Sequence, residues 1–254
     1  MLTSEYKDDV LIVSRCGNCT ISFSSTRLSD EYLETEYYES DFEGEFAGYD
    51  DYENISERFF AGIVEKVKRA QPGGRWLDVG CGRGYLVQAA VRNGFSGCGI
   101  DLSTEFVDDP SVDFRRADLF DSQFEAESFD VISVINVLDH IGDPHRFLTR
   151  IRELLKPGGL LFIHVPNERY FDRWPFRGQS TYIPSVHIVN YSQNNVADLL
   201  SRLGFSSCKV VAPRFKGSSS WKRMTLLRGL EAFNAVAGIF GMGILPTMQV
   251  LARK

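Results

Sequence analysis

A glycine-rich loop with an acid in front of it is the segment with the clearest chemical potential. Residues 78–84 read Asp-Val-Gly-Cys-Gly-Arg-Gly. Glycines permit positive φ angles and let a ligand approach the backbone closely. A dinucleotide fingerprint needs a further glycine at position 85, where Tyr85 stands, and the lysine of a phosphate loop is also missing. Asp78 tolerates a ligand with ammonium and sulfonium groups better than a pyrophosphate.

The segments around this loop predict alternating strands and helices. Strands are expected at 75–79, 97–100, 112–116, 129–135, 160–165, 208–212 and 247–252. Helices are expected over 55–67 and 86–92, after the N-cap Asp143 and after the N-cap Ser192. This order predicts an α/β fold with a seven-stranded, mostly parallel sheet and helices on both faces.

From about residue 55 to residue 210, the sequence resembles class I S-adenosylmethionine-dependent methyltransferases. The glycine loop, Asp101 after the second strand, the pair Asp118-Leu119 and the turn 154–159 stand in the family's order. The resemblance implies a Rossmann-like fold, S-adenosylmethionine as cofactor, and an enzyme that transfers its methyl group.

The resemblance also implies which residues bind the cofactor. The loop would wrap the methionine part, Asp101 would accept hydrogen bonds from the ribose hydroxyls, and Asp118 would border adenine. The expected set is Asp78, Gly80, Gly82, Gly84, Asp101, Leu102, Asp118, Leu119 and Asn136. Taken singly, the glycines could form any turn between a strand and a helix, Asp101 could cap a helix, and Asp118 could be a surface turn residue.

Residues 134–144 resemble the "L-E-H-x-x-D-P" segment of ubiquinone-biosynthesis and sugar or natural-product O-methyltransferases, with Asp139 in place of Glu. Methyl transfer to oxygen requires an in-line acceptor and often a base. Because histidine titrates near working pH, we expect His140 to be the base or to orient the acceptor hydroxyl, with Asp139 fixing its tautomer. A structural histidine bonded to the loop backbone is the alternative.

His187 is the second catalytic candidate. Residues 186–192 resemble the family's "D-H-x-x-x-[FY]-[ST]" segment, with Val186 in place of the acid. A buried histidine bonded to a strand is the alternative. Some relatives bind a divalent metal through two acids and the histidine of the earlier segment. Asn136 occupies the first acid position here and is a weaker ligand for a hard cation, so we expect no metal.

The predicted domain organisation has two parts. Residues 1–54 would form an N-terminal helical and knuckle extension, and residues 55–254 the methyltransferase domain, with a lid insertion at 166–186 and a helical insertion at 214–246. The extension includes a stretch, residues 30–53, with 11 acidic side chains and no Lys or Arg. This stretch is interpreted as either a solvated helix with an aromatic packing face or a lid over a ligand.

The pair Cys16 and Cys19, within a hairpin-like stretch, resembles half of a zinc ribbon. A structural zinc needs four ligands, and residues 1–15 contain no further cysteine, so we expect a knuckle without zinc.

The net charge and the distribution of apolar residues restrict the classes of binding partner. A net charge of −6 argues against sequence-independent binding to nucleic acid. The absence of a signal sequence and of a long apolar run predicts a cytoplasmic protein without membrane contact. An apolar helix predicted over 226–240 would pack on the domain or form a homodimer seam. The alternative is contact with a membrane surface, because Lys222, Arg223 and Arg228 lie at or before its start.

The expected reaction is methyl transfer to a hydroxyl oxygen of a small molecule. The alternatives are an N- or C-methyltransferase acting on a small molecule or a macromolecule, or a non-catalytic S-adenosylmethionine-binding scaffold. The "[ND]-P-P-[YF]" segment of base-methylating enzymes is absent after the fourth strand.

Overall fold

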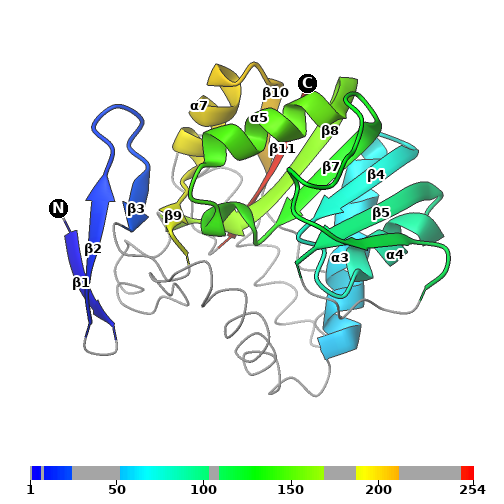
Figure 1. Cartoon of the computed structure of the whole chain (residues 1–254), viewed down its shortest axis with the longest axis horizontal. Coiled ribbons are helices and arrows are strands. Elements are labelled where there is room, and N and C mark those ends of the chain that lie inside the picture. The colour runs from blue at the N-terminus through cyan, green and yellow to red at the C-terminus, as the bar shows by residue number, and fades with distance from the viewer. Residues whose placement is uncertain (1, 7–8, 25–51, 103–108, 169–186, 212–246) are drawn as a thin grey trace, which may run out of the picture. The chain divides into compact units, whose positions relative to one another are not determined.

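A computed structural model of the chain describes residues 2–6, 9–24, 52–102, 109–168, 187–211 and 247–254, which contain both strands and helices (Figure 1). The strands are β1 (Leu2–Tyr6), β2 (Asp9–Arg15), β3 (Ser22–Ser24), β4 (Gly74–Val79), β5 (Phe95–Asp101), β6 (Asp113–Arg116), β7 (Phe129–Ile135), β8 (Leu155–Pro166), β9 (Val189–Asn190), β10 (Ser206–Val211) and β11 (Thr247–Arg253). The helices are α3 (Tyr52–Ala70), α4 (Tyr85–Arg92), α5 (Pro144–Leu154), α7 (Gln193–Arg202) and the short 3-10 helix η2 (Leu138–His140).

Seven strands form one sheet in the order β10-β11-β8-β7-β4-β5-β6. Strand β4 pairs in parallel with β5 and β7, and β5 pairs in parallel with β6. Strands β10 and β11 are antiparallel. This arrangement confirms the predicted α/β class with a seven-stranded, mostly parallel sheet.

One compact unit contains α3, β4, α4, β5, β6 and β7. Helix α4 follows Gly84, whose φ of 89° places the turn in the left-handed region, and it ends before Asn93. Its apolar face is buried, and the helix contacts β4, β5 and α3 (Figure 1). The interior of β4 and β7 is buried as well, as expected for parallel strands that are covered on both faces.

The other unit contains β1, β2, β3, η2, β9, α7, β10 and β11, while α5 and β8 have residues in both units. Strands β1, β2, β3 and β9 form an antiparallel four-stranded sheet. Helix α7 starts with a capping box, because the Ser192 side chain accepts the backbone N–H of Asn195 and the Asn195 side chain accepts that of Ser192.

Most predicted elements are present within a few residues of the expected bounds. Strand β8 is longer than predicted: it begins at Leu155, so the Pro157-Gly158-Gly159 segment lies within it. The reason is pairing with Lys254, whose backbone accepts from the N–H of Gly158 and donates to the carbonyl of Gly159. Strands β1 and β9 and helix η2 were not predicted.

Several expectations concern residues outside the described part of the chain. These are most of the acidic stretch 30–53, the lid insertion beyond residue 168, and the helical insertion 214–246 with its expected helix. The division into residues 1–54 and 55–254 stays a prediction. Within the described residues, no helix is long and apolar enough to span a bilayer.

Replacing Ser192 with Ala is expected to lower the free energy of unfolding by about 1 kcal/mol, because the backbone N–H of Asn195 loses its cap. Urea denaturation measures the change. Ser201→Ala, at an exposed position near the end of the same helix, is the control and should have little effect. Equal stability of both variants would contradict the role of the cap.

Candidate functional site

The loop between β4 and α4 places its glycines where a ligand can reach the backbone. Gly80, Gly82 and Gly84 all have positive φ, at 70°, 50° and 89°. The N–H of Gly82 donates to Oδ2 of Asp101 at 2.7 Å, so the loop after β4 is fastened to the end of β5. The carboxyl ends of two neighbouring parallel strands thus carry the predicted loop and the predicted acid together.

The loop glycines have different surroundings. A Cβ on Gly84 would stand 2.2 Å from the Phe114 ring, so this glycine is required by packing. A Cβ on Gly82 would meet no described atom within 4 Å, so the space beside it is open as far as the described residues go. The backbone at Gly82 is therefore suited to a ligand that lies directly against it.

Asp78 is held by two buried side chains from the strands. The indole N–H of Trp76 donates to Oγ of Ser133 at 2.8 Å, and the Ser133 hydroxyl donates to Oδ1 of Asp78 at 2.5 Å. Burial raises the pKa of Asp78 to about 8, and the hydrogen bond from Ser133 acts in the opposite direction. Ser133 was missed from the sequence, although it is a polar residue inside the apolar strand β7.

The residues expected beside adenine follow β5 and β6. The N–H of Ala117 donates to the carbonyl of Asp101, which places residues 117–119 next to the end of β5. Asp118 accepts the N–H of Phe120 and thereby closes a turn. Leu119 is buried, whereas Leu102 is 42% exposed. Leu102 is thus an apolar side chain that is available for contact.

Asn136 directly follows β7 and has an unusual backbone for a residue other than glycine. Its φ is 52°, and its N–H donates to the carbonyl of His164 at 2.8 Å. His164 is buried in β8, as its predicted place in a strand implies, and its Nδ1 lies 3.3 Å from Nε2 of Gln249. The Asn136 side chain is thus exposed, while its backbone is held in place by the hydrogen bond to β8.

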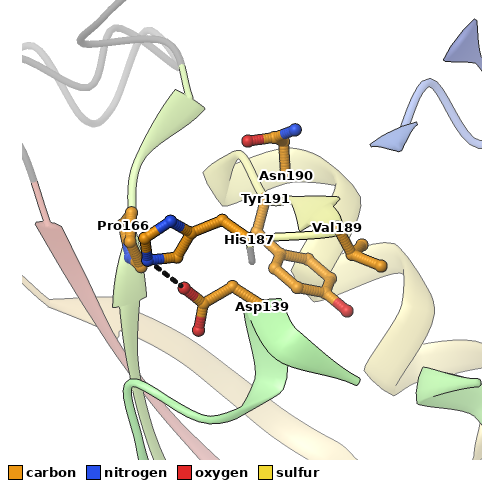
Figure 2. A pocket seen from close by; sticks show the side chains of 6 residues that line it. All are labelled: Asp139, Pro166, His187, Val189, Asn190 and Tyr191. Atoms are coloured by element: carbon orange, nitrogen blue, oxygen red, sulfur yellow. Dashed lines mark ion pairs between the residues drawn. The ribbon is translucent and has the colours of Figure 1, made fainter. Parts of the chain in front are cut away.

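Both predicted catalytic histidines lie beside Asp139. Oδ2 of Asp139 is 3.5 Å from Nε2 of His187 (Figure 2) and 3.7 Å from Nε2 of His140. The centroids of the two imidazole rings are 4.8 Å apart. Asp139 is 2% exposed, and neither of its oxygens has a hydrogen-bond partner among the described residues. Burial raises its pKa to about 6, and the positive charge of His187 opposes this shift.

A small pocket next to this cluster is lined by Asp139, Pro166, His187, Val189, Asn190 and Tyr191 (Figure 2). Tyr191 is buried, and its hydroxyl donates to the carbonyl of Leu138 at 3.5 Å, which connects β9 to the 3-10 helix that carries Asp139. Burial raises the pKa of Tyr191 well above its usual value. No role was predicted for Tyr191, because only tertiary structure brings it to Leu138.

The predicted hairpin around Cys16 and Cys19 is formed by β2 and β3. The N–H of Thr20 donates to the carbonyl of Cys16, and both cysteines are free thiols. Backbone N–H groups of Cys19 and Asn18 directed at the sulfur lower the pKa of Cys16. The absence of zinc from this knuckle stays a prediction.

Residues 52–209, more than half of the 254-residue chain, match the methyltransferase-domain family. The chain belongs to this methyltransferase family. Its curated relatives include the ubiquinone biosynthesis O-methyltransferases of Actinobacillus pleuropneumoniae serotype 5b, 36% identical over 109 residues, and of Xanthomonas campestris pv. campestris, 38% identical over 108 residues. The matched regions cover 37% and 39% of this methyltransferase and 47% and 45% of those relatives, so the chain spans about half their length.

Solved structures show the same fold at low sequence identity. A SAM-dependent methyltransferase from Archaeoglobus fulgidus superimposes with a TM-score of 0.58 at 15% identity, over 84% of this methyltransferase and 98% of that chain. The phosphoethanolamine N-methyltransferase 2 of Haemonchus contortus, in complex with S-adenosyl-L-methionine, gives a TM-score of 0.57 at 21% identity, over 92% and 61%. The fold is therefore that of S-adenosylmethionine-dependent methyltransferases.

Replacing Asp78 with Asn is expected to stabilise the protein increasingly as the pH rises from about 4 to about 8. The folded protein raises the pKa of this carboxyl from 3.8 to about 8, so its contribution to stability is full below pH 4 and is lost as the pH rises through that window. The difference between variant and wild type should change by at most about 1.4 kcal/mol per pH unit.

Chemical denaturation across this pH range, without ligand, measures the difference. Asp113→Asn is the control, because the hydrogen bond from Arg115 lowers the pKa of Asp113, and removing that carboxylate gives no gain with rising pH. A pH-independent difference for Asp78→Asn would show that Asp78 titrates normally.

Proposed function

We propose that this methyltransferase transfers the methyl group of S-adenosylmethionine to a hydroxyl oxygen of a small-molecule acceptor. The observation that carries the proposal is the fastening of Gly82 to Asp101, which joins an open glycine backbone to a carboxylate at neighbouring strand ends. The named activity of the relatives, ubiquinone biosynthesis O-methyltransferase, supports oxygen as the methylated atom.

The proposed donor site uses the residues that follow β4, β5 and β6. Asp78, Gly80, Gly82 and Gly84 hold the methionine part, and Asp101 accepts hydrogen bonds from the ribose hydroxyls. The donor set fits this cofactor, because a carboxylate offers acceptors only and the Gly82 backbone is open. Leu102, Asp118 and Leu119 border adenine, and Asn136 completes the site.

The proposed chemistry is a displacement at the methyl carbon. The acceptor oxygen forms the new C–O bond, the C–S bond breaks, and S-adenosylhomocysteine leaves as a neutral thioether. Nε2 of His140 takes the hydroxyl proton, and Oδ2 of Asp139, 3.7 Å away, stabilises the imidazolium that results. His187, whose Nε2 lies 3.5 Å from the same oxygen, keeps the acid in place and can take the same role. No metal ion takes part in this step.

We further propose that the acceptor is a small molecule rather than nucleic acid, that the methyltransferase forms a homodimer, and that it is cytoplasmic. Of these, the small-molecule acceptor has further support from the curated relatives.

Replacing Asp101 with Asn is expected to weaken the binding of S-adenosylhomocysteine about tenfold or more, because an amide oxygen can still accept the N–H of Gly82 but cannot accept from both ribose hydroxyls as a carboxylate does. Isothermal titration calorimetry measures the affinity. Asp121→Asn, at an exposed position beyond the loop, is the control. Unchanged affinity in Asp101→Asn would remove the carboxylate from the ribose site.

Replacing His140 with Gln is expected to lower turnover by about 10²- to 10⁴-fold while leaving the affinity for S-adenosylhomocysteine within twofold, because the base is lost and the donor site is kept. Transfer of a labelled methyl group to a fractionated small-molecule extract measures turnover and isolates the acceptor. His145→Gln, exposed on α5, is the control. If His140→Gln turns over at the wild-type rate, His140 is not the base.

A further inference from the structure

The cluster of Asp139, His140 and His187 has the composition of a metal site. Each residue offers one ligand atom, and the three ligand atoms lie within 4.8 Å of one another. Two imidazole nitrogens and one carboxylate oxygen suit Zn²⁺ and related transition metals better than Mg²⁺ or Ca²⁺, which prefer oxygen ligands alone.

The spacing of these atoms is too wide for direct hydrogen bonds and suits a shared ion. The separations of 3.7 Å and 3.5 Å between Asp139 Oδ2 and the two Nε2 atoms exceed a normal N–H···O distance. Ligands bound tetrahedrally to zinc at about 2.0–2.1 Å stand roughly 3.3–3.4 Å apart. The two separations from Asp139 therefore need to shorten by only a few tenths of an ångström, and the ligand atoms of the two histidines, which lie within 4.8 Å of each other, need to approach as the ion binds.

The carboxylate of Asp139 is buried away from water. Asp139 is 2% exposed, and both of its oxygens are without hydrogen-bond partners among the described residues. A buried carboxylate of this kind is costly unless it is paired, protonated or bound to a metal. The pocket beside it, which Pro166 and Tyr191 help to line, leaves room for a further ligand such as water (Figure 2).

We propose that Asp139, His140 and His187 bind one divalent transition-metal ion of the Zn²⁺ class. The sequence predicts no metal, because Asn136 stands where relatives have an acid. The fold nevertheless supplies a third ligand, His187, from a segment 47 residues after His140. Neither the methyl donor nor the acceptor is needed for this binding, so the inference goes beyond the proposed reaction.

An ion at this position excludes the role of His140 as a base. The lone pair of Nε2 that would accept the hydroxyl proton is the one that binds the metal, so both cannot occur together. Zinc is accordingly an inhibitor of methyl transfer, and a chelator restores activity. This competition separates the proposed site from one in which a metal assists the reaction.

The test uses chelator-treated full-length protein without cofactor or acceptor. Titration with Zn²⁺ in a calorimeter should give one ion per chain, and Co²⁺ should develop the visible absorption of a low-symmetry nitrogen and oxygen site. His187→Ala and Asp139→Asn should each weaken binding at least tenfold, whereas His145→Ala should bind as the wild type does. His187→Gln keeps a side chain of similar size but removes the imidazole ligand. If this variant melts at the wild-type temperature and still binds zinc weakly, the loss of binding comes from the missing ligand and not from unfolding.

Because thiolates also bind zinc, the double variant Cys16→Ser/Cys19→Ser is a necessary control. Undiminished binding in this variant supports the histidine site, and loss of binding there would overturn it. Absence of binding in the wild type, or unchanged binding in His187→Ala, would also overturn it. These results do not involve S-adenosylhomocysteine affinity, so they are independent of the donor-site tests. If zinc binds at the cluster and raises turnover, the competition with the base is wrong.

Discussion

The hydrogen bond between the Gly82 N–H and the Asp101 carboxylate is the interaction on which the proposed donor site depends. Parallel strands in one sheet end at the same edge, so the loop after β4 and the acid after β5 arrive there as neighbours. The bond then fixes their relative position. It also restricts the choice of residue, because only a side chain with several acceptor sites can hold the loop and still accept from a ligand.

Two buried acids illustrate how differently the fold treats a carboxyl group. Asp78 has a dedicated donor in Ser133, which is itself fixed by Trp76, so one oxygen of this acid is satisfied within the protein. Asp139 instead faces the more distant imidazoles of His140 and His187. The stability of the ionised Asp139 carboxylate therefore depends on whether those imidazoles bear a proton or bind another positive charge. Of the two acids, Asp139 is the one whose charge state responds to its neighbours.

The sequence was informative where local patterns determine structure. Apolar runs, the caps Asp143 and Ser192 and the glycine loop were sufficient to place the sheet strands and most helices. The motifs also predicted Asp101 at the end of the second strand of the domain, where the structure has it. The local pattern contained no signal for β9, a strand of only two residues that exists because β3 pairs with it. The meeting of His187 with Asp139 likewise arises from tertiary structure, as does the support of Asp78 by Ser133. The acceptor stays undetermined, because the segments expected to cover it lie outside the described residues.

The position of β11 in the sheet has a consequence for how the protein is made. Residues 247–253 form the strand between β8 and β10, and β10 has no other neighbour in the described sheet. During synthesis, β10 emerges first and must wait until some 36 further residues have been translated before its backbone can pair. The sheet is thus completed only once β11 has been translated, and until then the nascent chain carries an unpaired strand that holding chaperones are suited to protect.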